Sequence, residues 1–154
     1  MDSAYIICDT TVVSDLRHGG DRCRKMELLT TATKLISTVT RAEMFSGALQ
    51  AGWGVKKLED LRATLGAYVE IGIDSETAEA WAELAADCKQ RGIAPSPNDL
   101  WIAATALRLG VPVAALDNDY TSFAEIQVLG QDGILRRGPA LRKRLTAGRN
   151  EGEA

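Results

Sequence analysis

The chain has 154 residues, of which 45% are hydrophobic and 25% are charged. This length and composition fit one compact domain with a buried core and exclude a disordered or low-complexity chain. With 18 basic and 21 acidic residues the net charge is −3 at pH 7, so a diffuse positive surface is excluded and any polyanionic partner must be bound locally.

The three cysteines, Cys8, Cys23 and Cys88, show neither CxxC nor Cys/His spacing. This pattern favours neither a disulfide framework nor a zinc site and fits a reducing compartment. The N-terminus lacks the basic segment and long apolar run of a signal peptide, and the longest apolar tract, residues 100–116, is interrupted by arginine, glycine and proline. We therefore expect a cytoplasmic protein with no membrane span.

The first half of the chain repeats a strand-then-helix pattern. Residues 4–8 form a short apolar run typical of a buried strand, and the polar residues 9–16 follow at once as a predicted helix. Residues 34–39 form a second such run, and residues 40–52 follow with helical spacing that closes on a glycine.

The second half continues the alternation. Residues 76–90 predict a helix whose buried face carries Ala78, Trp81, Ala85 and Cys88. The next helix is predicted to start with Ser96 as its N-cap and Pro97 at its first position, and to end at Gly110. Residues 112–116 form a third apolar run, and residues 126–129 are expected to add an edge strand.

Strands separated by helices of this length predict an α/β fold, in which a parallel sheet is covered by helices on both faces. We expect a single domain over residues 1–135, followed by a basic C-terminal extension over residues 136–154 that is partly helical and then flexible. In such sheets ligands bind beyond the carboxyl ends of the strands, which is where the functional residues are expected.

Four acidic residues are predicted to lie at this edge. Asp9 directly follows the first strand, Glu43 lies four residues beyond the second, Asp117 directly follows the third, and Asp99 lies in the first turn of the helix that begins at Pro97. Such close negative charges destabilise a fold unless a cation compensates them. Oxygen ligands favour Mg²⁺, with Mn²⁺ as the other candidate, and metal-assisted hydrolysis of a phosphodiester is the natural reaction.

Each of these acids also has a purely structural explanation. Residues 40–43 and 96–99 both match the capping box, in which the acid returns a hydrogen bond to the start of its helix. Asp9 and Asp117 could each begin a turn. Two further residues remain open: Asp119 is either an additional ligand or a turn residue, and Thr10 either orients a phosphate or water or caps the following helix.

Other polar and aromatic residues are less informative. His18, the only histidine, is expected to be solvated in its glycine-containing loop. Trp81 and Trp101 are expected to pack in the core, whereas Trp53 between two glycines remains open to base stacking. Basic residues that either bind phosphate, contact a partner or are simply solvated form two groups, Arg17, Arg22, Arg24 and Lys25, and Arg136, Arg137, Arg142, Lys143 and Arg144.

Three segments of the sequence resemble the PIN-domain nucleases, and among them the VapC-type toxins of bacterial toxin-antitoxin pairs. These segments cover the predicted acidic positions and read IICDTTVVSDL, TVTRAEMFSGA and NDLWIAATALRLGVPVAALDNDYTSF. The resemblance implies a PIN-like three-layer sandwich and a Mg²⁺- or Mn²⁺-dependent endoribonuclease. Its substrate would be cellular RNA, usually tRNA or rRNA, and its partners a cognate antitoxin and a second copy of the chain.

The family's acidic positions map onto Asp9, Glu43, Asp99 and Asp117, with Asp9, Asp99 and Asp117 as implied metal ligands and Glu43 as a ligand or base. The chain departs from the family at Thr11 and Ala115, which bears on the hydrogen bonds around the carboxylates. The alternative is a catalytically weak or inactive module that binds RNA or protein. A receiver domain or a haloacid-dehalogenase-type phosphatase would need a second acid close after Asp9, where this chain has threonines.

Overall fold

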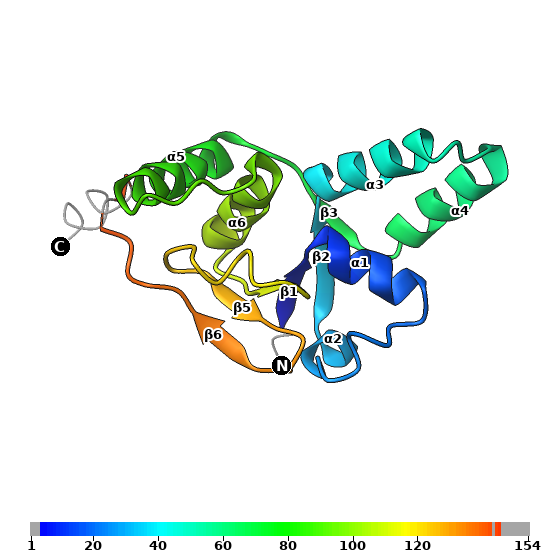
Figure 1. Ribbon diagram of the computed structural model, residues 1–154, viewed down its shortest axis with the longest axis horizontal. Coiled ribbons are helices and arrows are strands. Elements are labelled where there is room, and N and C mark those ends of the chain that lie inside the picture. The colour runs from blue at the N-terminus through cyan, green and yellow to red at the C-terminus, as the bar shows by residue number, and fades with distance from the viewer. Residues whose placement is uncertain (1–3, 143, 146–154) are drawn as a thin grey trace.

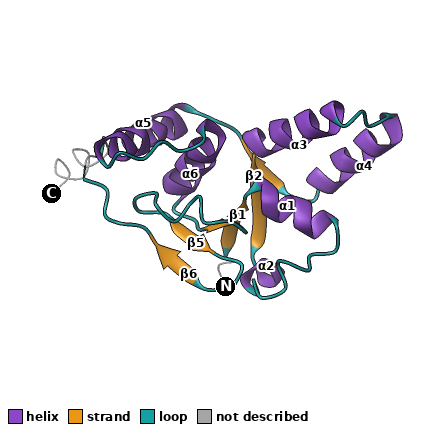
Figure 2. Cartoon of the chain, viewed as in Figure 1, coloured by secondary structure: helices purple, strands orange, loops and turns teal. Residues whose placement is uncertain are grey.

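The computed structural model describes residues 4–142 and 144–145 and shows a mixed α/β fold built on a six-stranded sheet. The strands lie in the order β3-β2-β1-β4-β5-β6 (Figures 1 and 2). Their bounds are β1 Tyr5–Cys8, β2 Thr33–Ser37, β3 Val69–Ile71, β4 Val113–Ala114, β5 Gln127–Leu129 and β6 Leu135–Arg137. The helices are α1 Thr10–Arg17, α2 Leu28–Thr31, α3 Thr38–Gln50, α4 Val55–Leu65, α5 Ser75–Gln90 and α6 Pro97–Leu109.

The sheet is parallel except at one edge. β1 is central and pairs in parallel with β2 on one side and β4 on the other. β5 also pairs in parallel with β4, but it is not an edge strand as predicted, because β6 adds outside it in antiparallel direction. The predicted parallel α/β class is therefore confirmed, with one antiparallel strand that the sequence pattern did not indicate.

Helices cover both faces of the sheet, which confirms the three-layer arrangement. Along β1, Ile7 faces the α5 and α6 side, while Ile6 and Cys8 face the side covered by α1 and the α3–α4 hairpin. This alternation follows from the two-residue period of a strand. Figure 1 shows α5 and α6 together on one side, with α3 and α4 projecting on the other.

The second strand ends earlier than predicted. Residues 34–39 were expected to be extended, but β2 stops at Ser37, and Thr38 and Val39 form the first turn of α3. The cause is the side chain of Ser37, whose oxygen accepts the backbone N–H of Val39 at 3.1 Å and caps the helix. A local cap thus overrides the β-propensity of two branched residues.

Helix α5 forms where predicted, and its predicted buried face is confirmed except at one position. Cys88 is buried and Trp81 and Ala85 pack partly buried against the core, but Ala78 is exposed. The other buried side chains are Thr77, Ala80, Glu83, Leu84 and Asp87. Two acids are buried because each has a partner: Asp87 pairs with Arg91 at 2.6 Å, and Glu83 accepts a backbone N–H from the C-terminal segment.

Helix α6 confirms its predicted boundaries. Pro97 occupies the first turn after Ser96, and the helix ends at Gly110, whose φ of 67° places it in the left-handed conformation that glycine adopts without strain. By contrast, α2, α4, β3 and β6 were not predicted. The sequences of α2, β3 and β6 are too short to carry a clear local signal, whereas α4 has helical spacing at Leu58, Leu61 and Leu65 that the prediction missed.

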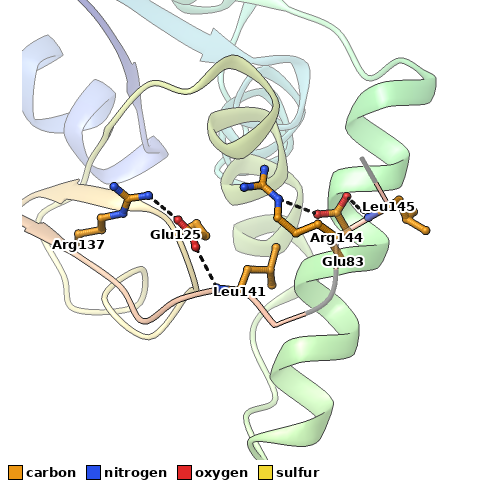
Figure 3. Close-up of polar contacts among 6 residues, drawn as sticks. All are labelled: Glu83, Glu125, Arg137, Leu141, Arg144 and Leu145. Atoms are coloured by element: carbon orange, nitrogen blue, oxygen red, sulfur yellow. Dashed lines mark hydrogen bonds and ion pairs between the residues drawn. The ribbon is translucent and has the colours of Figure 1, made fainter. Parts of the chain in front are cut away.

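The C-terminal segment crosses from β6 to α5 as a strap (Figure 3). Its residues 138–142 and 144–145 contain no helix, whereas Lys143 and residues 146–154 lie outside the described part of the chain, so the predicted helix is absent from the described part of the extension. Glu125 accepts the N–H of Leu141 at 3.0 Å, and Glu83 accepts that of Leu145 at 3.1 Å. The predicted boundary between residues 135 and 136 falls within β6.

All three cysteines are buried free thiols, in agreement with the absence of a predicted disulfide framework. Within the described residues, none of the helices combines the length and hydropathy needed to span a bilayer.

Candidate active site

The candidate site lies at the carboxyl ends of β1, β2 and β4, where α1, α3 and α6 begin. Parallel strands bring their carboxyl ends to one edge, so residues distant in sequence meet there. Asp9 follows β1 directly and is the N-cap of α1. Its side chain is only 4% exposed, so a charged carboxylate at this position needs hydrogen-bond donors close by.

A tyrosine joins two of the predicted acids. The hydroxyl oxygen of Tyr120 lies 2.8 Å from Oδ1 of Asp9 and 3.0 Å from Oδ1 of Asp99. The two carboxylates therefore lie on either side of one oxygen atom, although Asp9 follows β1 and Asp99 comes from the first turn of α6. Tyr120 was not among the predicted site residues, because no sequence spacing signals a contact between residues 111 positions apart.

Asp99 does not serve as a helix cap. Ser96 is at the N-cap position of α6, but its side chain makes no capping hydrogen bond, and the carboxylate of Asp99 meets Tyr120 instead. The capping-box explanation of residues 96–99 is therefore not what the structure shows.

Glu43 is placed by a different contact. The hydroxyl of Thr10 donates a 2.8 Å hydrogen bond to Oε1 of Glu43, which links the start of α1 to the second turn of α3. Because α3 begins at Thr38 with Ser37 as its cap, Glu43 lies too far inside the helix for a capping box. Thr10 is the first residue of α1 rather than its N-cap, so the capping alternative for Thr10 is wrong as well.

Asp117 lies in the turn after β4, half-buried, and its Oδ1 accepts the backbone N–H of Asp119 at 3.2 Å. Asp119 is exposed. The predicted turn role of Asp117 is thus present in the structure, and it leaves the second carboxylate oxygen, Oδ2, available.

The two departures from the family pattern have different consequences. The hydroxyl of Thr11 donates a 2.8 Å hydrogen bond to Oδ2 of Asp9. The same oxygen lies 3.5 Å from the backbone nitrogen of Leu116, so Thr11 links Asp9 to the segment that follows β4. Ala115 is fully buried and contributes only a methyl group to the core. Thr11 and Tyr120 therefore supply the side-chain hydrogen bonds to Asp9, and none comes from the side chain of position 115.

Two acids at this edge, Asp99 and Asp117, have a raised pKa, chiefly because they are partly buried. Burial, and then the charges of Asp9, Asp119 and Asp117, raise the pKa of Asp99 to about 6, although the hydrogen bond from Tyr120 acts in the opposite direction. Burial also raises the pKa of Asp117, with further contributions from Asp119 and Asp9. A phenol carries one hydrogen, so Tyr120 can donate to only one carboxylate at a time. The second short contact is satisfied when Asp99 carries a proton.

The carboxylates of Asp9, Asp99 and Asp117 are chemically suited to bind a hard divalent cation. All donors are oxygens, and a bound cation would offset both the burial and the neighbouring negative charges that raise the pKa of Asp99. As the side chains stand, no three Asp, Glu, His or Cys residues of the described part of the chain are close enough to hold one ion. The hydroxyl of Tyr120, between Asp9 and Asp99, accounts for part of this separation.

The other candidate residues lie outside this cluster. His18 is exposed at the end of α1, and its Nδ1 is 2.8 Å from the carbonyl oxygen of Ser14. Trp81 and Trp101 stack with ring centroids 5.3 Å apart but are only half-buried, so the prediction of core packing holds in part. Trp53 was left open to base stacking, but the guanidinium of Arg17 covers its ring at 4.7 Å.

Comparison with known proteins agrees with the fold. The PIN-domain family pattern matches residues 6–127. The chain is 33% identical over 97 residues to Ribonuclease VapC4 of Mycobacterium tuberculosis (strain ATCC 25618 / H37Rv), an alignment that covers 61% of this chain and 74% of that protein.

Two solved structures show the same architecture. DNA-bound VapBC from Salmonella typhimurium superposes with a TM-score of 0.73 at 19% identity and covers 83% of this chain and 98% of that one. VapBC-5 from Mycobacterium tuberculosis superposes with a TM-score of 0.58 at 26% identity, and the alignment covers 76% of this chain and 88% of that one. The α/β fold is thus shared with these toxin-antitoxin structures. The chain belongs to the PIN-domain family, among its VapC-type members.

Proposed function

We propose that this protein is a divalent-metal-dependent endoribonuclease that acts as the toxin of a toxin-antitoxin pair and hydrolyses phosphodiester bonds in cellular RNA. The observation that carries the proposal is the pair of carboxylates, Asp9 and Asp99, held on either side of the Tyr120 hydroxyl at the sheet edge. The similarity to a protein named Ribonuclease VapC4 supports the ribonuclease activity.

In this proposal Asp9, Asp99 and Asp117 hold Mg²⁺ or Mn²⁺. When bound, such an ion lowers the pKa of a water molecule and compensates the charge that develops on phosphate oxygens. Oδ2 of Asp9 stays fixed by Thr11, and the Tyr120 hydroxyl gives up at least one of its two carboxylate contacts. Asp119, exposed beside Asp117, is a further candidate ligand.

Glu43 acts as the base or as a further ligand. Thr10 holds Oε1 of Glu43 through its hydroxyl, so Oε2 remains to accept a proton from the attacking water. Thr10 thereby orients Glu43 rather than the substrate.

We propose a cognate antitoxin and a second copy of the chain as protein partners, and tRNA or rRNA as the substrate class. The antitoxin is supported by the likeness to structures described as VapBC complexes. The family resemblance alone supports the homodimer and the substrate class.

One observation favours a second candidate, a PIN-like module that binds RNA or protein without cutting. In the described residues, no three acidic, histidine or cysteine side chains are close enough together to hold one ion, and the hydroxyl of Tyr120 lies within hydrogen-bond distance of both Asp9 and Asp99.

The deciding experiment incubates the purified protein with total bacterial RNA in MgCl₂ or MnCl₂ and sequences the RNA ends produced. We expect new ends that EDTA abolishes and that Asp99→Asn removes while the fold is kept. Asp60→Asn, the same change at an exposed position of α4, is the matched control and should cleave normally. Undiminished cleavage by Asp99→Asn would reject the ligand role, and RNA binding without any cleavage by the unchanged protein would favour the binding module.

A further inference from the structure

Two hollows adjoin the candidate active site on the side of α1. The first, of about 450 Å³, is lined by Thr10, Thr11, Ser14, Asp15, His18 and Arg22. Thr10 and Thr11 are the residues that hydrogen-bond to Glu43 and Asp9, so this hollow begins at the carboxylates.

The second hollow continues from the first through Arg22, which lines both. It has a volume of about 410 Å³ and is lined by Asp21, Arg22, Arg24, Lys25, Gln131 and Asp132. The two hollows therefore lie on either side of Arg22, between the threonines that contact Asp9 and Glu43 and the loop of residues 19–25.

The position of Arg22 is fixed by its surroundings. The backbone N–H groups of Arg22 and Cys23 both donate to Oδ2 of Asp15 at 3.1 Å, which pins the loop to α1. Nη2 of Arg22 donates to the neutral side chain of Gln131 at 3.3 Å. The guanidinium is thus oriented without being neutralised.

The two groups of basic residues singled out in the sequence differ in their partners. In the C-terminal group, Arg136 pairs with Asp132 at 2.6 Å, and Arg137 and Arg144 pair with Glu125 and Glu83 (Figure 3). In the loop group, Arg22, Arg24 and Lys25 are exposed and form no ion pair within 4.0 Å with any described residue.

Arg142 of the C-terminal group is also exposed and forms no ion pair with a described residue, but it lines neither hollow, so the loop group supplies the unpaired positive charge there. Asp132, which lines the second hollow, is already paired with Arg136. Arg137 and Arg144 form ion pairs with Glu125 and Glu83 that hold the C-terminal strap in place. A phosphodiester chain that reaches an acidic site needs such unpaired cations on its path, because the protein's net charge is −3 and the carboxylates repel it.

Arg22 also lies near the carboxylates. It lines the same hollow as Thr10 and Thr11, which hydrogen-bond to Glu43 and Asp9. A phosphate bound at Arg22 would accordingly lie next to the acidic edge.

We propose that the loop of residues 19–25 is a phosphate-binding track, in which Arg22 binds a backbone phosphate adjacent to the scissile one and Arg24 and Lys25 bind phosphates further along the same RNA strand. This inference rests on the proposed ribonuclease function and assigns the path of its substrate. An acidic protein segment is the other conceivable occupant. RNA is favoured because Arg22 shares a hollow with Thr10 and Thr11, the residues that hydrogen-bond to the carboxylates of Glu43 and Asp9.

The test measures binding of a fluorescent single-stranded RNA of about 12 nucleotides in EDTA, where no cleavage occurs, over a range of salt concentrations. Arg22→Gln and the double variant Arg24→Gln/Lys25→Gln should each weaken binding several-fold. Each lost cation should also flatten the slope of log K against log salt by about 0.7. Arg22→Lys should keep the slope. Lys89→Gln, which removes one exposed charge at the end of α5, should change neither quantity.

The outcomes separate this inference from the proposed function. If the variants bind RNA like the unchanged protein while cleavage in Mg²⁺ is present, the track is wrong and the ribonuclease proposal stands. If RNA binding falls as expected but no condition yields cleavage, the track stands and the ribonuclease proposal fails. If the unchanged protein binds no RNA, or if the variants lose only antitoxin binding, the track is overturned. Melting curves of each variant verify that it is folded.

Discussion

The hydroxyl of Tyr120 donates a 2.8 Å hydrogen bond to the carboxylate of Asp9, a residue 111 positions earlier in the chain. Both side chains are buried, so this contact supplies a donor to a carboxylate that water barely reaches. Burial and the charges of Asp9 and Asp99 raise the pKa of Tyr120, so the phenol keeps its proton and remains a donor. The acidic edge is thereby stabilised in the absence of a cation.

Tyr120→Phe keeps the ring and removes this donor. We expect the free energy of unfolding in EDTA to fall by about 1.5–3 kcal/mol, the usual effect of losing a hydrogen bond to a charged group. Mg²⁺ should raise the melting temperature more in the variant than in the unchanged protein, because a cation then has no hydroxyl to displace. Denaturant and thermal melts measure both effects, with the exposed Tyr5→Phe as control. Identical stability of Tyr120→Phe and the unchanged protein in EDTA would contradict the assigned contact.

Thr10→Val tests whether Glu43 needs its anchor. Valine has the shape of threonine but cannot donate to Oε1 of Glu43, so the carboxylate loses the hydrogen bond that orients it. We expect kcat for RNA cleavage to fall roughly 10- to 100-fold, as for residues that support catalytic ligands, with little change in KM. Thr10→Ser, which restores a hydroxyl, should recover most of the rate. Steady-state kinetics that show full activity in Thr10→Val would remove Thr10 from the site.

Gly138→Ala tests the strap. A Cβ atom at Gly138 would lie 1.8 Å from the carbonyl oxygen of Phe123, so the backbone must move to admit it. We expect a loss of about 1–3 kcal/mol in the free energy of unfolding, measured by denaturant titration. At Gly47, within α3, a Cβ atom would meet nothing within 4 Å. Gly47→Ala should therefore be neutral or stabilising by up to about 1 kcal/mol, and equal effects of the two substitutions would contradict this account.

The strap should also loosen in acid. The N–H of Leu141 and the guanidinium of Arg137 hold the pKa of Glu125 below its ordinary value of 4.5. Since the folded-state pKa lies below the unfolded one, this stabilisation is complete above 4.5 and is lost as the pH falls through the folded value. Hydrogen exchange of residues 138–142 should accelerate in that range. Glu125→Gln should show fast exchange already at neutral pH, and a strap equally protected in both proteins would refute the role of Glu125.

Residues with strong local signals were placed well by the sequence. Pro97 and Gly110 bound a helix through backbone preferences that act within a few residues, and α6 has those ends. Asp9 follows an apolar strand, so its position at the sheet edge needs only the parallel order of the strands. The end of β2 was misplaced because the side chain of Ser37 caps a helix that the branched residues after it do not favour.

The tertiary structure alone decided which atoms meet. Tyr120 between Asp9 and Asp99 could not be foreseen, since the contact depends on how the turn after β4 folds back over the sheet. The difference between free and paired arginines had the same origin: Arg22 and Arg144 look alike in the sequence, and only the fold places Glu83 of α5 beside Arg144. Local backbone preferences and the alternation of apolar residues depend only on residues that are close together in the chain. The sequence by itself therefore determined the α/β class and the edge of the sheet at which the acidic residues gather. Hydrogen bonds and ion pairs act over a few ångströms between distant positions, and they exist only once the chain has folded.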